Sequence, residues 1–127
     1  MIRKTRIYLL VLVLLLLAGC SKPAVFDGSR VTNETGFHMD YTALNREETA
    51  VLELSEGDLL QVVLSHTGGS VDVIIGQEGK EPVYKGTGQE NAAFDVTIPE
   101  TGRYRISVTG HQAKGTVSFT HVPGAGE

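Results

Sequence analysis

Residues 102–110 read GRYRISVTG, and their side chains alternate between apolar and polar with a period of two. Successive side chains of a β-strand point to opposite faces, so this alternation is typical of a strand with one buried face. The apolar residues that would face a core are Tyr104, Ile106 and Val108. Arg103 and Arg105 are therefore expected to lie side by side on the solvent face of the strand.

The same alternation recurs along most of the chain after residue 36. The further predicted strands cover residues 37–42, 49–54, 60–64, 71–75, 82–85, 94–98 and 116–122. Turns are predicted at 55–58, 67–70 and 99–102, and a loop at 110–115, because these stretches are rich in glycine, proline and small polar residues. Because each strand hides one face only, two sheets must pack together. The sequence thus predicts an all-β fold, an antiparallel two-sheet β-sandwich of about eight strands, with no helix after the N-terminal segment.

The N-terminus, MIRKTRIYLLVLVLLLLAGC, has the three parts of an export signal: basic residues, an uncharged apolar run over 7–17, and a small pair before a cysteine. The apolar run is shorter than the ~20 residues that cross a bilayer, and it has the length of a signal-peptide core. Leu17-Ala18-Gly19-Cys20 resembles the bacterial lipobox. The resemblance implies cleavage between Gly19 and Cys20, and a mature Cys20 that carries S-diacylglycerol and N-palmitoyl groups. An ordinary secretory signal or a short membrane anchor is the alternative.

The sequence divides into four parts on this interpretation. They are a signal peptide (1–19), a lipidated tether (20–30), a β-sandwich domain (31–123) and a flexible tail (124–127). Two acyl chains suffice for stable membrane anchoring, so the expected location is the extracytoplasmic face of the cell membrane. Ser21 stands where lipoproteins of the inner membrane carry Asp, which points to the outer membrane where an envelope has two.

Charge and cysteine content narrow the classes of partner. Removal of residues 1–19 takes away three of the 11 basic residues and none of the 15 acidic ones, which leaves a formal charge of −7. An acidic chain does not gain from the electrostatics of nucleic acid, so DNA and RNA are not expected partners. A single cysteine excludes an internal disulfide and a cysteine-rich zinc site.

Four segments of the mature chain together resemble the bacterial pre-peptidase C-terminal domain and its jelly-roll relatives. They are Leu54-x-x-Gly57-Asp58-x-Leu60, Gly69 to Ile75, Gly102-x-Tyr104-x-Ile106-x-Val108-x-Gly110 and Gly115 to Phe119. The likeness spans roughly residues 45–122. It implies a jelly-roll-like sandwich and a non-catalytic role, and some members bind calcium or matrix polymers.

Several residues are candidates for binding. The resemblance makes Asp72 a candidate calcium ligand; its alternative role is to cap the turn at Gly68-Gly69. The histidines, His38, His66, His111 and His121, lack metal-ligand spacing, and we expect them to be solvated rather than to share a metal.

Tyr84 with Lys85 is the expected surface for a sugar, because most other aromatic residues fall on inward positions. Arg103 and Arg105 are candidates for an anionic group; an exposed strand of alternating charge is the alternative.

No motif for catalysis is present: there is no G-x-S-x-G elbow and no phosphate-binding loop, and Cys20 is expected to carry the lipid. We therefore expect no enzymatic activity and no cofactor. The sequence favours a lipid-anchored, extracytoplasmic, non-catalytic module that has a structural or protein-interaction role on the bacterial envelope. Its expected partners are the membrane, through the lipid, and another envelope protein or a wall polymer. A glycan- or calcium-binding module is the alternative.

Overall fold

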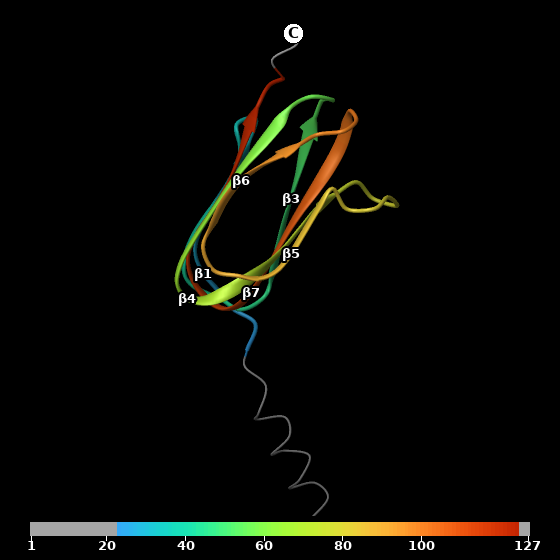
Figure 1. The fold of residues 1–127 in the computed structure, drawn as a ribbon. Helices are drawn as coiled ribbons and strands as arrows, with labels where there is room; N and C mark the ends of the chain where they lie inside the picture. Colours follow the sequence, from blue (N-terminus) through green and yellow to red (C-terminus); the bar gives the residue numbers. More distant parts are fainter. Residues whose placement is uncertain (1–22, 125–127) are drawn as a thin grey trace, which may run out of the picture.

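The computed structural model describes residues 23–124, which form seven β-strands and no helix (Figure 1). The strands are β1 (Phe26–Asn33), β2 (Gly36–Leu44), β3 (Glu47–Leu54), β4 (Leu59–Gly76), β5 (Tyr84–Gln89), β6 (Ala92–Thr97) and β7 (Gly102–Val122). The predicted all-β fold is confirmed. The signal peptide and the Gly19–Cys20 cleavage site lie outside the described residues. Within residues 23–124, no helix has the length and apolarity needed to span a membrane.

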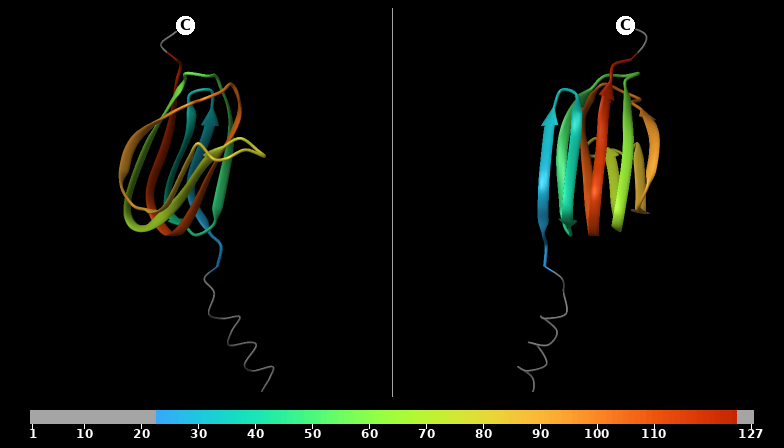
Figure 2. Two further views of the ribbon diagram at one scale, coloured as in Figure 1. Left: turned by 45° about the vertical axis from the view of Figure 1, so that its right-hand side comes forward. Right: turned by 90° about the vertical axis from the view of Figure 1, so that its left-hand side faces the viewer.

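All strand pairs are antiparallel, and they belong to one hydrogen-bonded sheet with the order β1-β2-β7-β4-β5. β3 pairs with the beginning of β7, and β6 pairs with the beginning of β4. The long strands β4 and β7 therefore belong to two halves of the sheet. The first half consists of β1, β2, the end of β7, the beginning of β4, and the whole of β6. These segments lie side by side in Figure 2, right. The second half consists of β3, the beginning of β7, the end of β4 and β5.

This continuity corrects two predicted connections. Residues 67–70 and 110–115 do not end strands; β4 and β7 run through them and shift register between His66 and Ser70. The local conformation explains why: Gly69 has a φ of 65° and Gln112 a φ of 51°. A side chain on Gly69 would lie 2.2 Å from the main-chain oxygen of Gln112, so only glycine fits there. The chain thus bends at Gly69 in β4 and at Gln112 in β7, and the strand count is seven instead of about eight.

Two boundaries also differ from the predicted ones. β1 begins at Phe26, so the segment Phe26–Arg30, which was expected to belong to the tether, is part of the sheet. The predicted edge strand at 82–85 begins later, at Tyr84, and extends to Gln89. Exposed residues 23–25 precede the first strand, and this end of the described chain lies opposite its C-terminal end (Figure 1).

The core lies between the two halves of the sheet, and the inward residues of both halves form one buried cluster. The predicted inward set of the seventh strand is confirmed, because Tyr104, Ile106 and Val108 are fully buried. The largest buried side chains are Tyr41, Tyr104, Phe37, Phe119, Leu44, Leu60, Ile75, Ile98 and Ile106. Phe94, expected inside, is only half-buried and packs at the margin of the core.

Candidate ligand-binding groove

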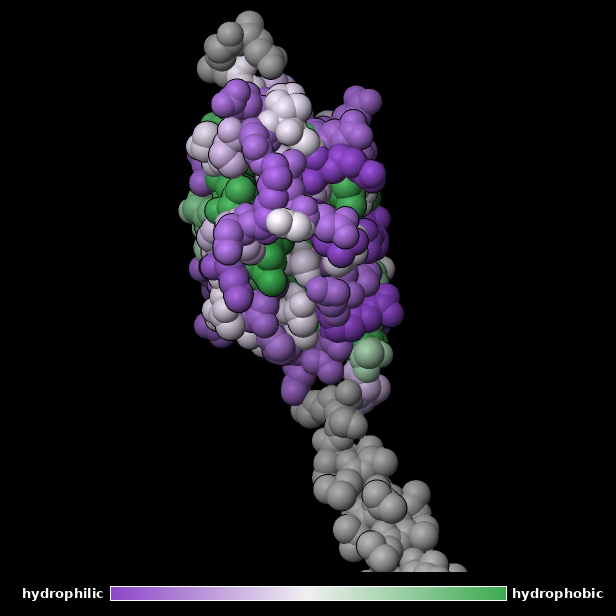
Figure 3. All heavy atoms as spheres, turned by 90° about the vertical axis from the view of Figure 1, so that its right-hand side faces the viewer, coloured by the Kyte–Doolittle hydropathy of each residue, from purple (hydrophilic) through white to green (hydrophobic). Residues whose placement is uncertain are grey.

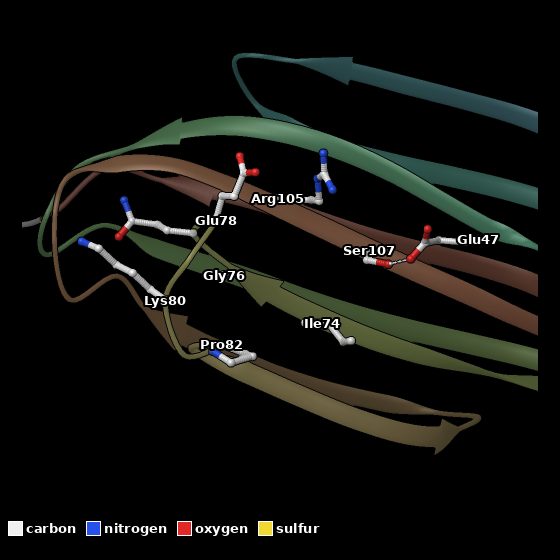
Figure 4. A pocket seen from close by; sticks show the side chains of 9 residues that line it. Glu47, Ile74, Gly76, Glu78, Lys80, Pro82, Arg105 and Ser107 are labelled. Carbon is white, nitrogen blue, oxygen red and sulfur yellow. Dashed lines mark hydrogen bonds between the residues drawn. The ribbon is translucent and has the colours of Figure 1, made fainter.

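A groove runs over the outer face of the second half of the sheet and encloses about 270 Å³ (Figure 4). Cross-strand register places Arg105 between Val51 of β3 and Gly76 of β4, and the next outward row places Ser107 beside Ile74. The groove is lined by Glu47, Ile74, Gly76, Gln77, Glu78, Lys80, Pro82, Arg105 and Ser107. Seen from this side, the surface is mostly hydrophilic with small separate hydrophobic patches (Figure 3).

The loop between β4 and β5 forms one wall of this groove. It folds back on the end of β4, where the Val83 N–H donates to the Ile75 oxygen at 2.8 Å. Gly76 makes this fold possible, because a Cβ atom at that position would lie 3.0 Å from Pro82 Cα. The missing side chain therefore lets the loop approach the sheet beside Arg105.

The two arginines predicted to face solvent do so, and both are exposed. Among residues 23–124, no hydrogen bond or ion pair engages the guanidinium of Arg103 or Arg105. Both contribute, with Val51 and Glu78, to a hollow that adjoins the groove and shares Arg105 and Glu78 with it. The outer face thus offers two guanidinium groups that are free to bind an anion.

The acidic residues of the groove differ in how they are held. Glu47 Oε2 accepts a hydrogen bond from Ser107 Oγ at 2.6 Å, which fixes that carboxylate at the floor. Glu78 makes no hydrogen bond with the described residues, and its side chain projects on the same side as Arg105 in Figure 4. Lys80 is engaged in an ion pair with Glu100. Glu78 is therefore the carboxylate that would meet an incoming anion.

Tyr84 and Lys85 point to opposite faces of β5. Lys85 lies opposite the outward Ile74 and is exposed, on the same outer face as the groove. Tyr84 lies opposite the buried Ile75, and its ring stacks on that of Phe94 with 4.5 Å between centroids. The structure does not bring Tyr84 and Lys85 together as a sugar-binding surface.

Asp72 also has different partners from those predicted. Its Oδ2 pairs with His111 Nε2 at 2.8 Å, and its Oδ1 accepts from the Gly88 N–H at 2.8 Å. The hydrogen bond from His111, then that from Gly88, holds the pKa of the Asp72 carboxyl below its ordinary value. Asp72 thus fastens β5 to the bend of β7 instead of capping a turn at 68–69. Within residues 23–124, no three or more His, Cys, Asp or Glu side chains gather closely enough to hold a metal ion.

The expectation of solvated histidines is wrong for His66, which is buried at the bend of β4. Its Nδ1 lies 2.6 Å from the Glu90 carbonyl oxygen, an acceptor, so Nδ1 carries the proton. Nε2 accordingly accepts the hydrogen bond that the Tyr41 hydroxyl donates. His121 Nε2 is hydrogen-bonded to Oδ2 of the buried Asp58 carboxylate at 2.6 Å. This contact gives His121 a structural role as well.

The alternation in the sequence indicates the two arginines, but it does not indicate that Ile74, Ser107 and the loop 77–82 complete the groove. The polar residues around Gly79 are typical of a loop, although no loop was predicted there. Nothing in them indicated which face of the sheet the loop would cover. No protein-family model matches this chain, and no curated protein matches it in sequence. The resemblances to lipoproteins and to the pre-peptidase C-terminal domain stay predictions from the residues that carry them.

Proposed function

We propose that this protein is a lipid-anchored, extracytoplasmic, non-catalytic module that binds another component of the bacterial envelope. The observation that carries the proposal is the segment Leu17–Cys20 after an uncharged apolar run, with the only cysteine of the chain at its end. Processing at that cysteine would leave an acylated residue just ahead of a folded domain. The mature charge of −7 disfavours binding to anionic lipid heads, so the acyl chains would supply the attachment.

The arrangement of the described residues suits this role. β1 begins six residues after Cys20, and residues 23–25 enter the domain at one end of its long axis (Figure 1). An anchor there would hold that end at the membrane and leave the outer faces of the sheet accessible from the side. Restriction to a surface raises the effective concentration of a module near its partners, which is the physical benefit of such an anchor.

Metabolic labelling tests the anchor. Cells that produce the full chain are grown with an alkyne analogue of palmitate, and their membranes are separated from soluble fractions. The native chain should carry the label and sediment with membranes, whereas Cys20→Ser should lose both properties. Ser29→Ala, which changes an exposed side chain of β1 and keeps the cysteine, is the matched control and should behave like the native chain. A native chain that sediments with membranes but carries no label would refute the lipid anchor.

A further inference from the structure

The unpaired positive charges of the domain gather on one face. Seven lysines and arginines lie within residues 23–124, and three of them, Arg30, Arg46 and Lys80, form ion pairs with glutamates. Four have no such partner among the described residues: Lys85, Arg103, Arg105 and Lys114. All of these except Lys114 lie on the outer face of the second half of the sheet. The same face also carries Glu53, which lies across from Arg103, and the groove residues Glu47 and Glu78, so cationic and anionic side chains are interspersed there.

The chemistry of the two arginines defines the ligand group. A guanidinium presents a planar fork of N–H donors that matches a carboxylate in two-point contact. Arg103 and Arg105 are two residues apart on β7 and share one face, so they can bind one extended anionic chain in succession.

Apolar side chains beside the arginines define the rest of the ligand. Val51, which is 42% exposed, lies opposite Arg105, and Ile74, which is 38% exposed, lies opposite Ser107. No aromatic side chain within residues 23–124 points outward from this face, since Tyr84 and Tyr104 both turn inward. A sugar ring would find no stacking platform, whereas aliphatic side chains of a peptide would find apolar contacts.

From these contacts we infer that the groove binds an extended acidic and aliphatic peptide segment of a partner protein. Carboxylates of the segment would pair with Arg105 and Arg103, and its aliphatic side chains would cover Ile74 and Val51. This inference rests on the proposed interaction role for its setting, and it assigns that role a site and a class of ligand. Glu78 sets the affinity from within the groove, because its carboxylate repels the ligand beside Arg105.

Binding is measured by fluorescence polarisation with the full acylated chain in a neutral detergent and with full-length Cys20→Ser. The probe is the fluorescein-labelled peptide Val-Ser-Glu-Ser-Val-Ser-Glu, whose extended form presents valine and glutamate on the same face, and its control has glutamine in place of glutamate. The glutamate peptide should bind and the glutamine peptide should not.

Arg105→Gln should weaken binding about tenfold, the loss expected for one charge-assisted contact. Glu78→Gln should tighten binding about two- to fivefold, because it removes a like charge at close range.

Lys114→Gln is the matched control, because it removes one unpaired cation outside the groove and changes the net charge by the same amount. It should leave the affinity within about twofold, since exposed charges beyond the Debye length are screened. Circular dichroism verifies that each variant keeps the native fold. Equal weakening by Lys114→Gln and Arg105→Gln, equal binding of both peptides, or no binding by the native chain would overturn the inference. So would displacement of the peptide by polygalacturonate at lower concentrations than by the unlabelled peptide.

The two proposals can fail separately. If Cys20→Ser leaves the membrane but binds the peptide as tightly as the native chain, both stand. If the native chain is acylated but binds no peptide, the groove inference fails and the anchored module remains. If the chain binds the peptide but is never acylated, the anchor fails and the groove remains.

Discussion

Arg30 of β1 donates a hydrogen bond from Nη2 to the main-chain oxygen of Thr49 in β3, with 2.6 Å between the two atoms. β1 is the end strand of the first half of the sheet, and β3 is the end strand of the second half. The same guanidinium lies 3.2 Å from Glu48 Oε1 and 5.0 Å above the ring centroid of Phe37. Arg30 therefore closes one seam of the folded sheet and occupies a main-chain acceptor at a strand edge, where unpaired groups otherwise invite aggregation.

Replacement of Arg30 by alanine should lower the free energy of unfolding by about 1–2 kcal/mol, because it removes a hydrogen bond to the main chain and a cation–π contact. The ion pair with Glu48 adds little to this figure, since the arginine is partly exposed. Urea unfolding followed by circular dichroism measures the change. Arg103→Ala removes an arginine that has no partner among the described residues, and it should stay within about 0.5 kcal/mol of the native chain. Equal effects of the two variants would show that Arg30 does not close the seam.

Tyr84 and Phe94 close the opposite seam, between β5 and β6. Either substitution by alanine should destabilise the fold by about 1–2 kcal/mol, because both rings are half-buried against the core. In a double-mutant cycle, the two changes should show a coupling of about 0.5–1.5 kcal/mol from the stacked pair. Lys85→Ala, on the opposite face of β5, should change stability by less than about 0.5 kcal/mol. Strict additivity of Tyr84→Ala and Phe94→Ala would contradict the direct contact.

The buried hydrogen bond between Tyr41 and His66 holds the bend of β4 against β2. Tyr41→Phe should cost about 1–3 kcal/mol, because His66 Nε2 would lose its donor in a buried site. Tyr84→Phe removes a hydroxyl that has no hydrogen bond within the described residues, and it should be nearly neutral. Chemical denaturation of both variants makes the comparison, and similar costs for the two would contradict a special role of the buried pair.

The same tyrosine predicts how stability changes at alkaline pH. Burial raises the pKa of the Tyr41 phenol well above its ordinary range. The folded chain therefore holds this proton more tightly than the unfolded chain, and the stabilisation is complete below the unfolded pKa of about 10. It should fall as the pH rises above about 10. Urea midpoints between pH 8 and 11 should decline more steeply for the native chain than for Tyr41→Phe, and parallel curves would refute the assignment.

Asp58 predicts the response to acid. The Ser55 N–H, then the hydrogen bond from His121 and the Gly124 N–H, hold the pKa of this buried carboxyl below its ordinary value. Its contribution is therefore present above the unfolded pKa of about 4, and it is lost as the pH falls below that value. Asp58→Asn should be less stable at neutral pH and should lose less stability between pH 5 and pH 2. An unchanged acid slope would show that Asp58 is not responsible.

The alternation of side chains was sufficient to predict the strands and the inward residues, because a period of two depends only on local geometry. It could not predict that β4 and β7 continue through their glycines. A glycine with positive φ suits a turn and a bulge equally well, and only the approach of Gly69 to Gln112 in the folded sheet decides between them. The alternation therefore predicted separate strands where β4 and β7 each continue through a bend and join all seven strands in one hydrogen-bonded sheet.

The sequence was likewise sufficient to predict one part of the candidate site, the two arginines, but not the groove around them. The outward direction of Arg103 and Arg105 follows from the alternation, and it is confirmed. The groove around Arg105 also needs the loop 77–82 to fold over Gly76, which depends on tertiary contacts such as that between Pro82 and the end of β4. The stacking of Tyr84 on Phe94 also depends on a tertiary contact, between β5 and β6, that the alternation does not indicate.

Mass spectrometry of the protein purified from membranes shows directly whether Cys20 is acylated. We expect an N-terminal peptide that begins at Cys20, lacks residues 1–19, and carries the added mass of a diacylglycerol group, with or without an N-linked acyl chain. A chain that retains residues 1–19, or one in which Cys20 carries a free thiol, would contradict this expectation.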